Sequence, residues 1–409
     1  MTVAAGSAVL FAAQGAFAAN QALEDLFITA CTGAVGDMAT SCGNAPGSLL
    51  SGDAESSMNP SQALTSNDLS LSRAKTMMRE AQERLDRERQ EKAGIPTGRN
   101  AGNSVEFGAL SLFLNLTGEI FDRDRLLDID NEKGYDGWKT GFQFGGDYRV
   151  GDKLVVGALL GYDHSESKFD PDQPGVGFNP GGDEGGTRSD SLLVNVYSSY
   201  NVTDSFHIDG TLGYGYTDYT FDRNAIFQNT ARNFAAGIST VGETHGQEYS
   251  ASVGMGYDFY RNAFSFGPYV RVSYSRSVIQ GYTEEDRSGT GLNMTIGEDS
   301  VTSLTTTAGF QGSYAASTDW GVLVPQMRVE YEHEFDRDVR SITTSFAQTG
   351  AANSLAVSTD KPDRDYVNLG ASLLFVLPNG WMPFVDVETL VSYKDLDRQR
   401  YTAGLRVEF

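Results

Sequence analysis

The chain has 409 residues and a formal net charge of −23. This charge argues against nucleic acid as a partner and against docking onto an anionic leaflet, because both need basic surfaces. The 46 glycines, 19 tyrosines and 23 phenylalanines, with only two cysteines, favour many β-strands over a helical bundle or a disulfide-rich scaffold.

Residues 1–19 have the features of a secretory signal. The run 3–19 is apolar and rich in small residues, and positions 16–18 read Ala-Phe-Ala, a small-x-small pattern that a signal peptidase accepts. The usual basic start is missing, so a small buried alanine-rich helix is the alternative. No later run reaches about 18 apolar residues, and we therefore expect no transmembrane helix.

Residues 20–63 form a short segment rich in Gly, Ser, Ala and Asn, without a sustained period. It contains both cysteines, Cys31 and Cys42. In an exported chain, two cysteines at this spacing predict one disulfide. A metal site is the weaker interpretation, because it needs more ligands and no histidine precedes His164.

Residues 64–93 predict one long helix. Asn67 or Asp68 could cap it, and Gly94 with Pro96 would end it. Apart from one apolar stripe, the helix is densely charged with both signs, so a solvated amphipathic or coiled-coil helix is an equally good interpretation of these residues alone. The stripe consists of Leu71, Ala74, Met78, Ala81 and Leu85.

From residue 104 to residue 409, apolar and polar residues alternate with a period of two, which is typical of half-buried strands. In the last strand, Leu405 and Val407 share one face while Arg406 lies on the other. Twelve such segments are predicted: 104–120, 137–150, 153–168, 189–201, 204–222, 246–260, 263–282, 300–315, 320–336, 364–377, 380–394 and 398–409. The outer face of the first is ambiguous, because Leu110, Leu112, Leu114 and Leu116 compete with Val105, Phe107 and Phe113.

The connections between these strands alternate between short and long. Tight turns are expected at 151–152, 202–203, 261–262, 316–319 and 378–379, with a short last connection at 395–397. Long polar loops are expected at 121–136, 169–188, 223–245, 283–299 and 337–363. Outer-membrane barrels show this alternation, with tight turns facing the periplasm and long loops outside. The strands also exceed the usual length of about 5–6 residues in soluble sheets. We therefore predict a twelve-stranded antiparallel transmembrane β-barrel in a bacterial outer membrane, with the C-terminus at the periplasmic rim.

Several runs within residues 104–409 closely resemble the autotransporter β-domain family. These are GWKTGFQFGGDYRVGDKLVVGALLGYDHSESKFD, FHIDGTLGYGYTDY, GYDFYRNAFSFGPYVRVSYSR, VPQMRVEYEHEFDRD and DRDYVNLGASLLFVLPNGWMPFVDVETLV. The end, TAGLRVEF, resembles an outer-membrane assembly signal made by Gly404, Leu405, Val407 and Phe409. The resemblance implies insertion by the β-barrel assembly machinery into outer-membrane lipid and lipopolysaccharide. Family members have an N-terminal helix that threads the barrel and leads to a secreted passenger.

The resemblance implies the following organisation. Residues 1–19 are a signal, 20–63 a short passenger-like segment, 64–103 a lumen helix with its linker, and 104–409 the barrel. A wet lumen could hold the mixed-charge helix through hydrated ion pairs, each worth under about 1 kcal/mol. The expected lumen charges are Arg328, Glu330, Asp386, Glu388, Lys394, Arg400 and Arg406. Family passengers are usually long and repetitive, whereas this chain has no internal repeat.

Sequence motifs for catalysis are absent: there is no Gly-x-Ser-x-Gly, His-Glu-x-x-His or P-loop. We expect no catalytic, cofactor or metal site; a metal at His333, between Glu332 and Glu334, is the strongest alternative. The predicted function is a translocator that passes or displays its own N-terminal segment. The alternatives are a helix-plugged porin-like barrel and an adhesive barrel that uses loops 223–245 and 337–363.

Overall fold

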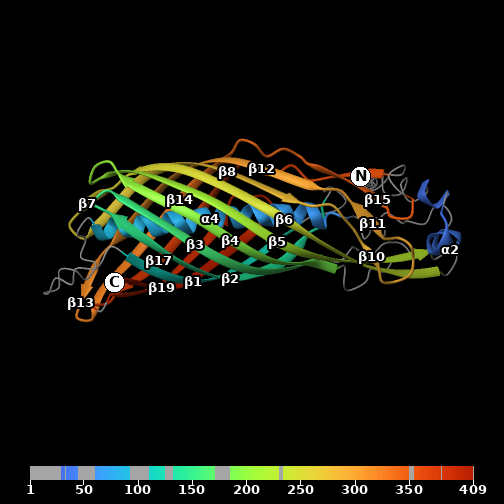
Figure 1. The fold of residues 1–409 in the computed structure, drawn as a ribbon, viewed down its shortest axis with the longest axis horizontal. Coiled ribbons are helices and arrows are strands. Elements are labelled where there is room, and N and C mark those ends of the chain that lie inside the picture. The colour runs from blue at the N-terminus through green and yellow to red at the C-terminus, as the bar shows by residue number, and fades with distance from the viewer. Residues whose placement is uncertain are drawn as a thin grey trace, which may run out of the picture.

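The computed structural model (Figure 1) describes residues 29–32, 34–44, 60–92, 110–124, 132–170, 185–229, 234–349, 354–378 and 380–408. The expected signal at 1–19, residues 20–28, 33 and 45–59 of the passenger-like segment, the linker at 93–103, the start of the first predicted strand and Phe409 of the assembly signal lie outside these residues. Inside them, no helix is both long enough and apolar enough to cross a membrane.

Twelve long antiparallel strands close into one barrel, as predicted. The sheet order runs from β6 back through β1 to β19 and on to β8, which pairs with β6 and completes the ring. The strands are β1 (Leu110–Arg123), β2 (Tyr135–Val150), β3 (Leu154–Phe169), β4 (Gly185–Asn201), β5 (Phe206–Asn229), β6 (Phe234–Tyr257), β8 (Phe264–Ile279), β12 (Asp299–Tyr314), β14 (Gly321–Glu334), β17 (Asp365–Val376), β18 (Trp381–Val391) and β19 (Asp397–Glu408). Closure leaves no bare strand edge in hydrocarbon, where an unpaired backbone group would be costly.

The period-two pattern determines which side chains face lipid. Leu192 and Leu212 are 60% and 62% exposed on the outer face, whereas Asn195 and Asp209 are almost completely buried on the inner face. In β1 the leucines point outward and Phe113 points inward, which settles the ambiguity of that strand. The outer surface is therefore apolar and the lumen is polar, as expected for a membrane barrel.

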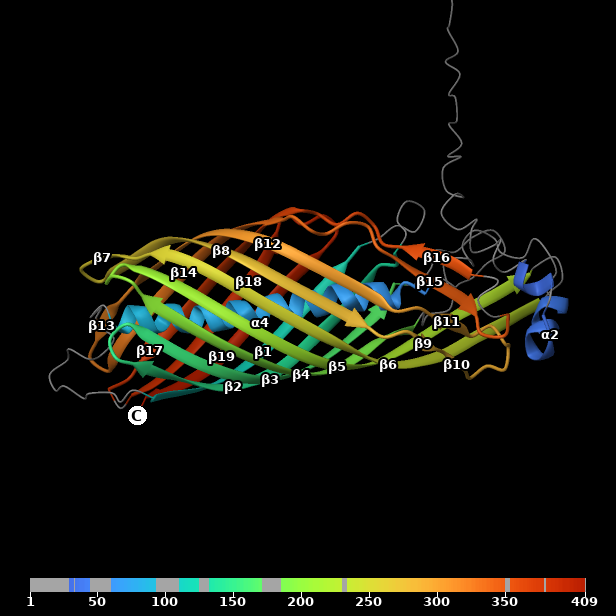
Figure 2. The same cartoon turned by 45° about the horizontal axis from the view of Figure 1, so that its top comes forward.

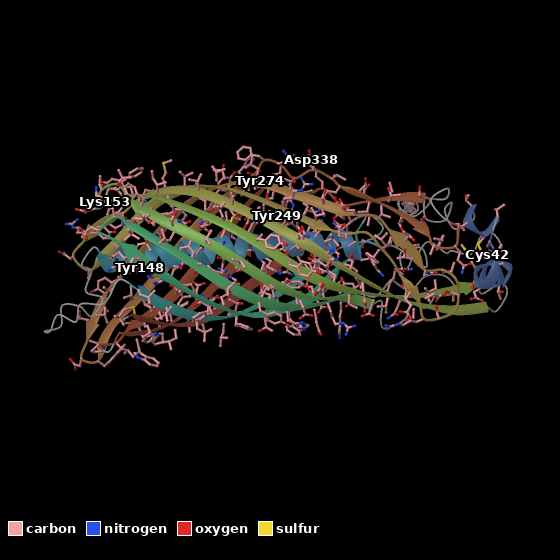
Figure 3. All side chains as sticks on the ribbon, viewed as in Figure 1. Cys42, Tyr148, Lys153, Tyr249, Tyr274 and Asp338 are labelled. Carbon is pink, nitrogen blue, oxygen red and sulfur yellow. A yellow bond between two sulfur atoms is a disulfide. The ribbon has the colours of Figure 1, made fainter. Side chains whose placement is uncertain are left out.

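The barrel has a tight-turn end and a long-loop end. Gly151 and Asn262 take positive φ angles in two of the tight turns, which explains why Gly and Asn stand there. In Figure 3, Tyr148 and Lys153 mark the tight-turn end and Cys42 lies beyond the opposite end. Tyr249 lies on the outer wall between them.

The predicted loop at 223–245 is wrong, because most of it is strand. β5 and β6 run 24 residues each and stay paired from Phe206 and Tyr257 to Asn229 and Phe234. Glycines and polar residues hide the alternation in this hairpin, which projects beyond the rest of the barrel (Figure 1).

Two other predicted loops, 283–299 and 337–363, also contain strands. They contribute β9 (Tyr282–Thr283), β11 (Met294–Ile296), β15 (Ser341–Phe346) and β16 (Ser354–Ser358), which form a separate four-stranded sheet at the long-loop end. Figure 2 shows them gathered there. The remaining short strands, β7 (Phe259–Arg261), β10 (Glu285–Asp286) and β13 (Ala316–Thr318), pair with β8, β6 and β14.

Of the helices ahead of the barrel, the structure gives the bounds of α2 and α4 within the residues it describes. The short helix α2 (Gly36–Asn44) lies at the long-loop end, and the long helix α4 (Gln62–Lys92) runs through the lumen (Figures 1 and 2). α4 begins at the long-loop end, where Asn67 donates to Asp299 at the start of β12. It ends toward the tight turns, where Arg84 meets Asp147 near the end of β2.

Candidate functional site: the helix-filled lumen

One face of α4 is apolar and packs on one part of the barrel wall. The helix residues Met77, Ala81 and Leu85 belong to a single buried cluster with inward-facing residues of β1, β3 and β4. These wall residues are Phe113, Val155, Leu159, Leu193 and Tyr197. Large apolar side chains are unusual in a wet lumen, and here they pack on Ala81 and Leu85 of the predicted apolar stripe and on Met77, which lies outside that stripe.

The opposite wall binds α4 through charges, centred on Arg79. Its guanidinium contacts Glu330 at 3.2 Å and Glu332 at 2.9 Å, both on β14, and it also contacts Glu388 on β18. None of these four side chains is more than 6% exposed. One helix cation therefore neutralises carboxylates from two strands of the wall, β14 and β18, which lie on either side of β17.

Helix charges of the opposite sign follow at the next residue, Glu80, and one turn further along, at Glu83. Glu83 accepts from Arg328 of β14 at 2.6 Å, and Glu80 lies 3.3 Å from Arg400 of β19. Arg328 and Arg400 also reach Glu388, at 2.7 and 3.2 Å. The result is one connected network of alternating sign rather than a set of separate pairs.

Two further cations of α4 bind other parts of the wall. Arg73 donates to Glu248 of β6 at 2.6 Å, and Lys75 binds Glu334 of β14 at 2.8 Å. Helix contacts are thus distributed around the lumen. This arrangement fixes both the rotation of α4 and its depth in the barrel.

Burial changes the expected strength of these ion pairs. From the sequence, the ion pairs between α4 and the wall are expected to be hydrated and weak. In the structure, however, Arg73 and Arg400 are each only 2% exposed. Removing one partner of a buried pair costs about 3–5 kcal/mol, because it leaves the other charge uncompensated. The expectation that these pairs are hydrated is therefore wrong.

The structure places most of the expected lumen charges against α4 or beside it. Arg328, Glu330, Glu388 and Arg400 belong to the network above. Asp386 is buried and lines a cavity with Glu83 and Asp86. Arg406 is buried and donates to Ser111 of β1 at 3.0 Å.

Lys394 does not face the lumen, and that expectation is wrong. Its side chain is 70% exposed at the rim and lies 3.2 Å from Asp395. Ser392 and Asp395 take positive φ angles, so the chain turns here and the period-two pattern stops before Lys394.

Several lumen residues were missed by the sequence analysis. Arg73, Arg79, Asp147 and Glu248 all take part in helix–wall pairs. The signal that could have found the wall residues is present, because each carboxylate occupies an inner-face position of an alternating strand.

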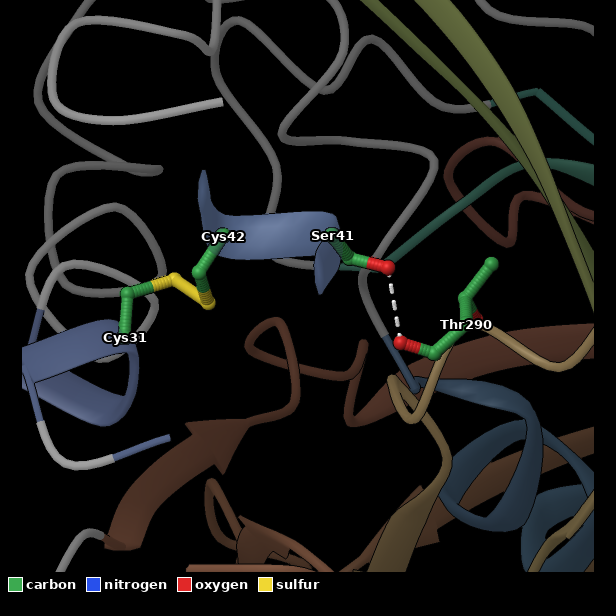
Figure 4. Close-up of a disulfide and its surroundings, with 4 residues drawn as sticks. All are labelled: Cys31, Ser41, Cys42 and Thr290. Atoms are coloured by element: carbon green, nitrogen blue, oxygen red, sulfur yellow. Dashed lines mark hydrogen bonds between the residues drawn. A yellow bond between two sulfur atoms is a disulfide. The ribbon is translucent and has the colours of Figure 1, made fainter. Parts of the chain in front are cut away.

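At the long-loop end, residues 29–32 and 34–44, here termed the cap, pack on the projecting strands. A disulfide joins Cys31 and Cys42, whose Cα atoms are 5.4 Å apart, and Ser41 Oγ donates to the carbonyl of Thr290 at 2.8 Å (Figure 4). Ala30 and Met38 are completely buried. The cap shares its hydrophobic core with Ala63, Leu64, Tyr219, Phe221, Ile238, Ile279, Tyr282, Leu292, Met294, Ile296, Ile342, Phe346 and Val357.

The loop beneath the cap is held by two acidic side chains. Glu284 forms a two-point pair with Arg223, at 2.8 and 2.5 Å. Asp286 accepts from the backbone N–H groups of Gly291, Ser288 and Gly289. Partial burial raises the pKa of Asp286, but these hydrogen bonds outweigh it and hold the pKa below its ordinary value.

An apolar outer wall, a polar lumen and a helix filling that lumen define an outer-membrane β-barrel of the translocator class. The chain belongs to the autotransporter β-domain family, whose sequence model matches residues 120–388. The resemblance stated from the sequence is thereby confirmed. The protein is a translocator barrel for a passenger segment and lies in the outer membrane.

Individual relatives agree with this assignment. The chain is 26% identical over 258 residues to Esterase EstA of Pseudomonas aeruginosa, and equally to Esterase EstA of Pseudomonas putida. The matches cover 60% of this chain but 36% of those proteins, so the chain spans about a third of the length of these relatives.

Solved structures show the same fold. The translocator domain of the autotransporter NalP from Neisseria meningitidis has a TM-score of 0.60 at 12% identity, covering 85% of this chain and 99% of that one. The β-domain of the Bordetella autotransporter BrkA has a TM-score of 0.50 at 18% identity, covering 74% and 100%.

Proposed function

We propose that this barrel exports its own residues 20–63 and keeps them at the cell surface, with the cap docked on the long-loop end. One observation carries the proposal: α4 traverses the lumen, and the cap that precedes it packs on the long-loop end. In this orientation the long loops are extracellular, and the tight turns and the C-terminus face the periplasm.

The proposal includes the division of the chain. Residues 1–19 serve as the export signal, 20–63 as the passenger-like segment, 64–103 as the helix and linker, and 104–409 as the barrel. Assembly requires the β-barrel assembly machinery, with the C-terminal residues Gly404, Leu405, Val407 and Phe409 as its signal. Outer-membrane lipid and lipopolysaccharide surround the apolar wall.

The buried contacts of the cap support retention rather than release. Met38 and Ala30 would expose apolar surface if the cap left, at a cost of about 1.5–3 kcal/mol for a fully buried methionine. We assign no enzymatic activity to this segment, and the esterase names belong to relatives of which the chain covers 36%.

Protease treatment of intact cells tests the display. A protease added outside should cut within residues 20–63 and leave a barrel that keeps its heat-modifiable gel mobility. The proposal fails if residues 20–63 are cut only after the outer membrane has been broken.

A helix-plugged barrel is the second candidate, favoured by the buried ion pairs that hold α4 in place. Single-channel conductance of the full chain should be low, and a variant lacking 20–103 should open a larger pore. Equal conductance of the two proteins would show that α4 does not occupy the lumen. The adhesive alternative is less well supported, because strands that support the cap occupy most of 223–245 and the segments 341–346 and 354–358 of 337–363.

A further inference from the structure

Near the tight-turn end, α4 and β5 bring together three side chains of metal-binding type. Asp86 comes from the helix, and His207 and Asp209 are the first two lumen-facing residues of β5. One possible ligand atom from each of the three lies within 4.8 Å of the other two. His207 and Asp209 are 3% and 1% exposed, so this is an interior cluster.

A second carboxylate, that of Asp258, lies near the other ring nitrogen of His207, although the two form no hydrogen bond in this geometry. His207 Nδ1 lies 3.2 Å from Asp258 Oδ2, while its Nε2 lies 3.6 Å from Asp209 Oδ2. Metal-binding histidines commonly present one ring nitrogen to the metal and the other to a carboxylate, which fixes the tautomer. Gly256 leaves room for the ring, because a Cβ at that position would lie 2.6 Å from Nε2.

A buried amide beside the cluster points to a ligand independently. Gln82 donates from Nε2 to Asp209, but its Oε1 is buried and has no hydrogen-bond partner among the residues that the structure describes. The side chain is 8% exposed. A buried acceptor without a donor is costly, and a cation held by Asp209 would satisfy it.

We propose that Asp86, His207 and Asp209 form a divalent transition-metal site that joins α4 to the barrel wall, with Zn²⁺ as its best-matched ion. One imidazole with carboxylate oxygens suits Zn²⁺, whereas Ca²⁺ and Mg²⁺ prefer sites made of oxygen alone. Tetrahedral ligands about 2.0–2.2 Å from Zn²⁺ lie roughly 3.3 Å apart. His207 and Asp209 are close to that separation, and binding would draw Asp86 inward.

The role that follows for the metal ion is to stabilise α4 in its position inside the barrel. Bound only by the folded barrel with α4 in place, the metal would stabilise that state by mass action. It would act at the end of α4 opposite the cap, so the helix would be held at both ends of the lumen.

The test is Zn²⁺ titration of the purified full chain in detergent, without a histidine tag and with its disulfide intact. We expect one Zn²⁺ per chain, with binding reduced at least tenfold in both His207→Asn and Asp86→Asn. Asp258→Asn should weaken binding about 10- to 100-fold, as for other residues that orient a ligand. Zn²⁺ should also raise the unfolding temperature of the wild type in the heat-modifiable gel assay.

His245→Asn is the matched control, because His245 stacks on Tyr216 in the outward-facing row instead of lining the lumen. All variants must first show the folded gel mobility. If His207→Asn does not, His207→Gln takes its place. The proposal is overturned if the wild type binds no Zn²⁺ at 1:1, or if His207→Asn and His245→Asn bind equally. Unchanged binding by Asp86→Asn, or tighter binding of Ca²⁺ than Zn²⁺, would also overturn it.

Discussion

Arg84 of α4 and Asp147 of β2 form a buried two-point ion pair, with Nε–Oδ2 and Nη2–Oδ1 distances of 2.5 and 2.8 Å. Such a fork matches two nitrogens to two oxygens and so fixes direction as well as distance. The pair therefore locks the rotation of the helix against the wall near the tight-turn end.

The coupling between these two residues can be measured. We expect Arg84→Ala and Asp147→Ala each to destabilise the folded barrel, and the double variant to lose less than the sum, with a coupling of about 0.5–3 kcal/mol. Denaturant unfolding in detergent gives the three differences. Strict additivity would mean that the two side chains do not interact in solution.

Arg79 should be the most costly cation of α4 to remove. Arg79→Met leaves its glutamate partners on β14 and β18 without a helix charge, so we expect a loss of about 3–5 kcal/mol in the free energy of unfolding. Arg261→Ala, at the exposed last residue of β7, is the control and should stay within about 0.5 kcal/mol of wild type. Similar behaviour of the two variants would show that α4 is held by packing alone.

The disulfide should matter to the cap and not to the barrel. Replacing Cys31 and Cys42 by serine removes the constraint on the cap, and we expect faster proteolysis of residues 29–44 with unchanged heat-modifiable mobility of the barrel. Thr40→Ser, an exposed change in the same helix, is the comparison. A barrel that fails to fold without the disulfide would contradict this separation.

The loop beneath the cap should loosen in acid. Because the folded pKa of Asp286 is depressed, its contribution is fully present above the unfolded value of about 3.9 and is lost as the pH falls through the folded pKa. Asp286→Asn should therefore destabilise the loop at pH 7, and the difference from wild type should shrink at low pH.

Amide hydrogen exchange of Ser288, Gly289 and Gly291 follows this loop directly, since these N–H groups are the donors. Asp319→Asn, in an exposed tight turn, should leave their exchange unchanged. Equal protection in Asp286→Asn and wild type at pH 7 would refute the assignment.

The barrel was predictable because the alternation of apolar and polar residues is visible within each single strand. Alternation in single strands, as in Leu405, Arg406 and Val407, specifies two faces, and glycine and asparagine identify tight turns such as Gly151 and Asn262. The projecting hairpin was not predictable by the same rule, since buried apolar side chains such as Phe221 and Ile238 pack in the core shared with the cap instead of facing lipid. The prediction that Lys394 faces the lumen was wrong because a turn interrupts the period-two pattern before this residue.

The site required a different kind of information. The wall carboxylates were visible as inner-face residues, but their partners depend on the rotation and depth of α4. Arg79 meets strands β14 and β18, which are far from it in sequence, and only the closed barrel brings them together. Asp86 and His207 were likewise unrelated in the sequence until α4 was placed beside β5.

The central claim is that α4 threads the barrel and leaves residues 20–63 outside the cell. Its most direct test compares an epitope inserted within 45–59 with the same epitope in the tight turn 151–153, using an impermeant antibody on intact cells. We predict that the first epitope is labelled on intact cells and the second only after the outer membrane is opened. Labelling of the turn on intact cells, with the N-terminal epitope protected, would contradict the account.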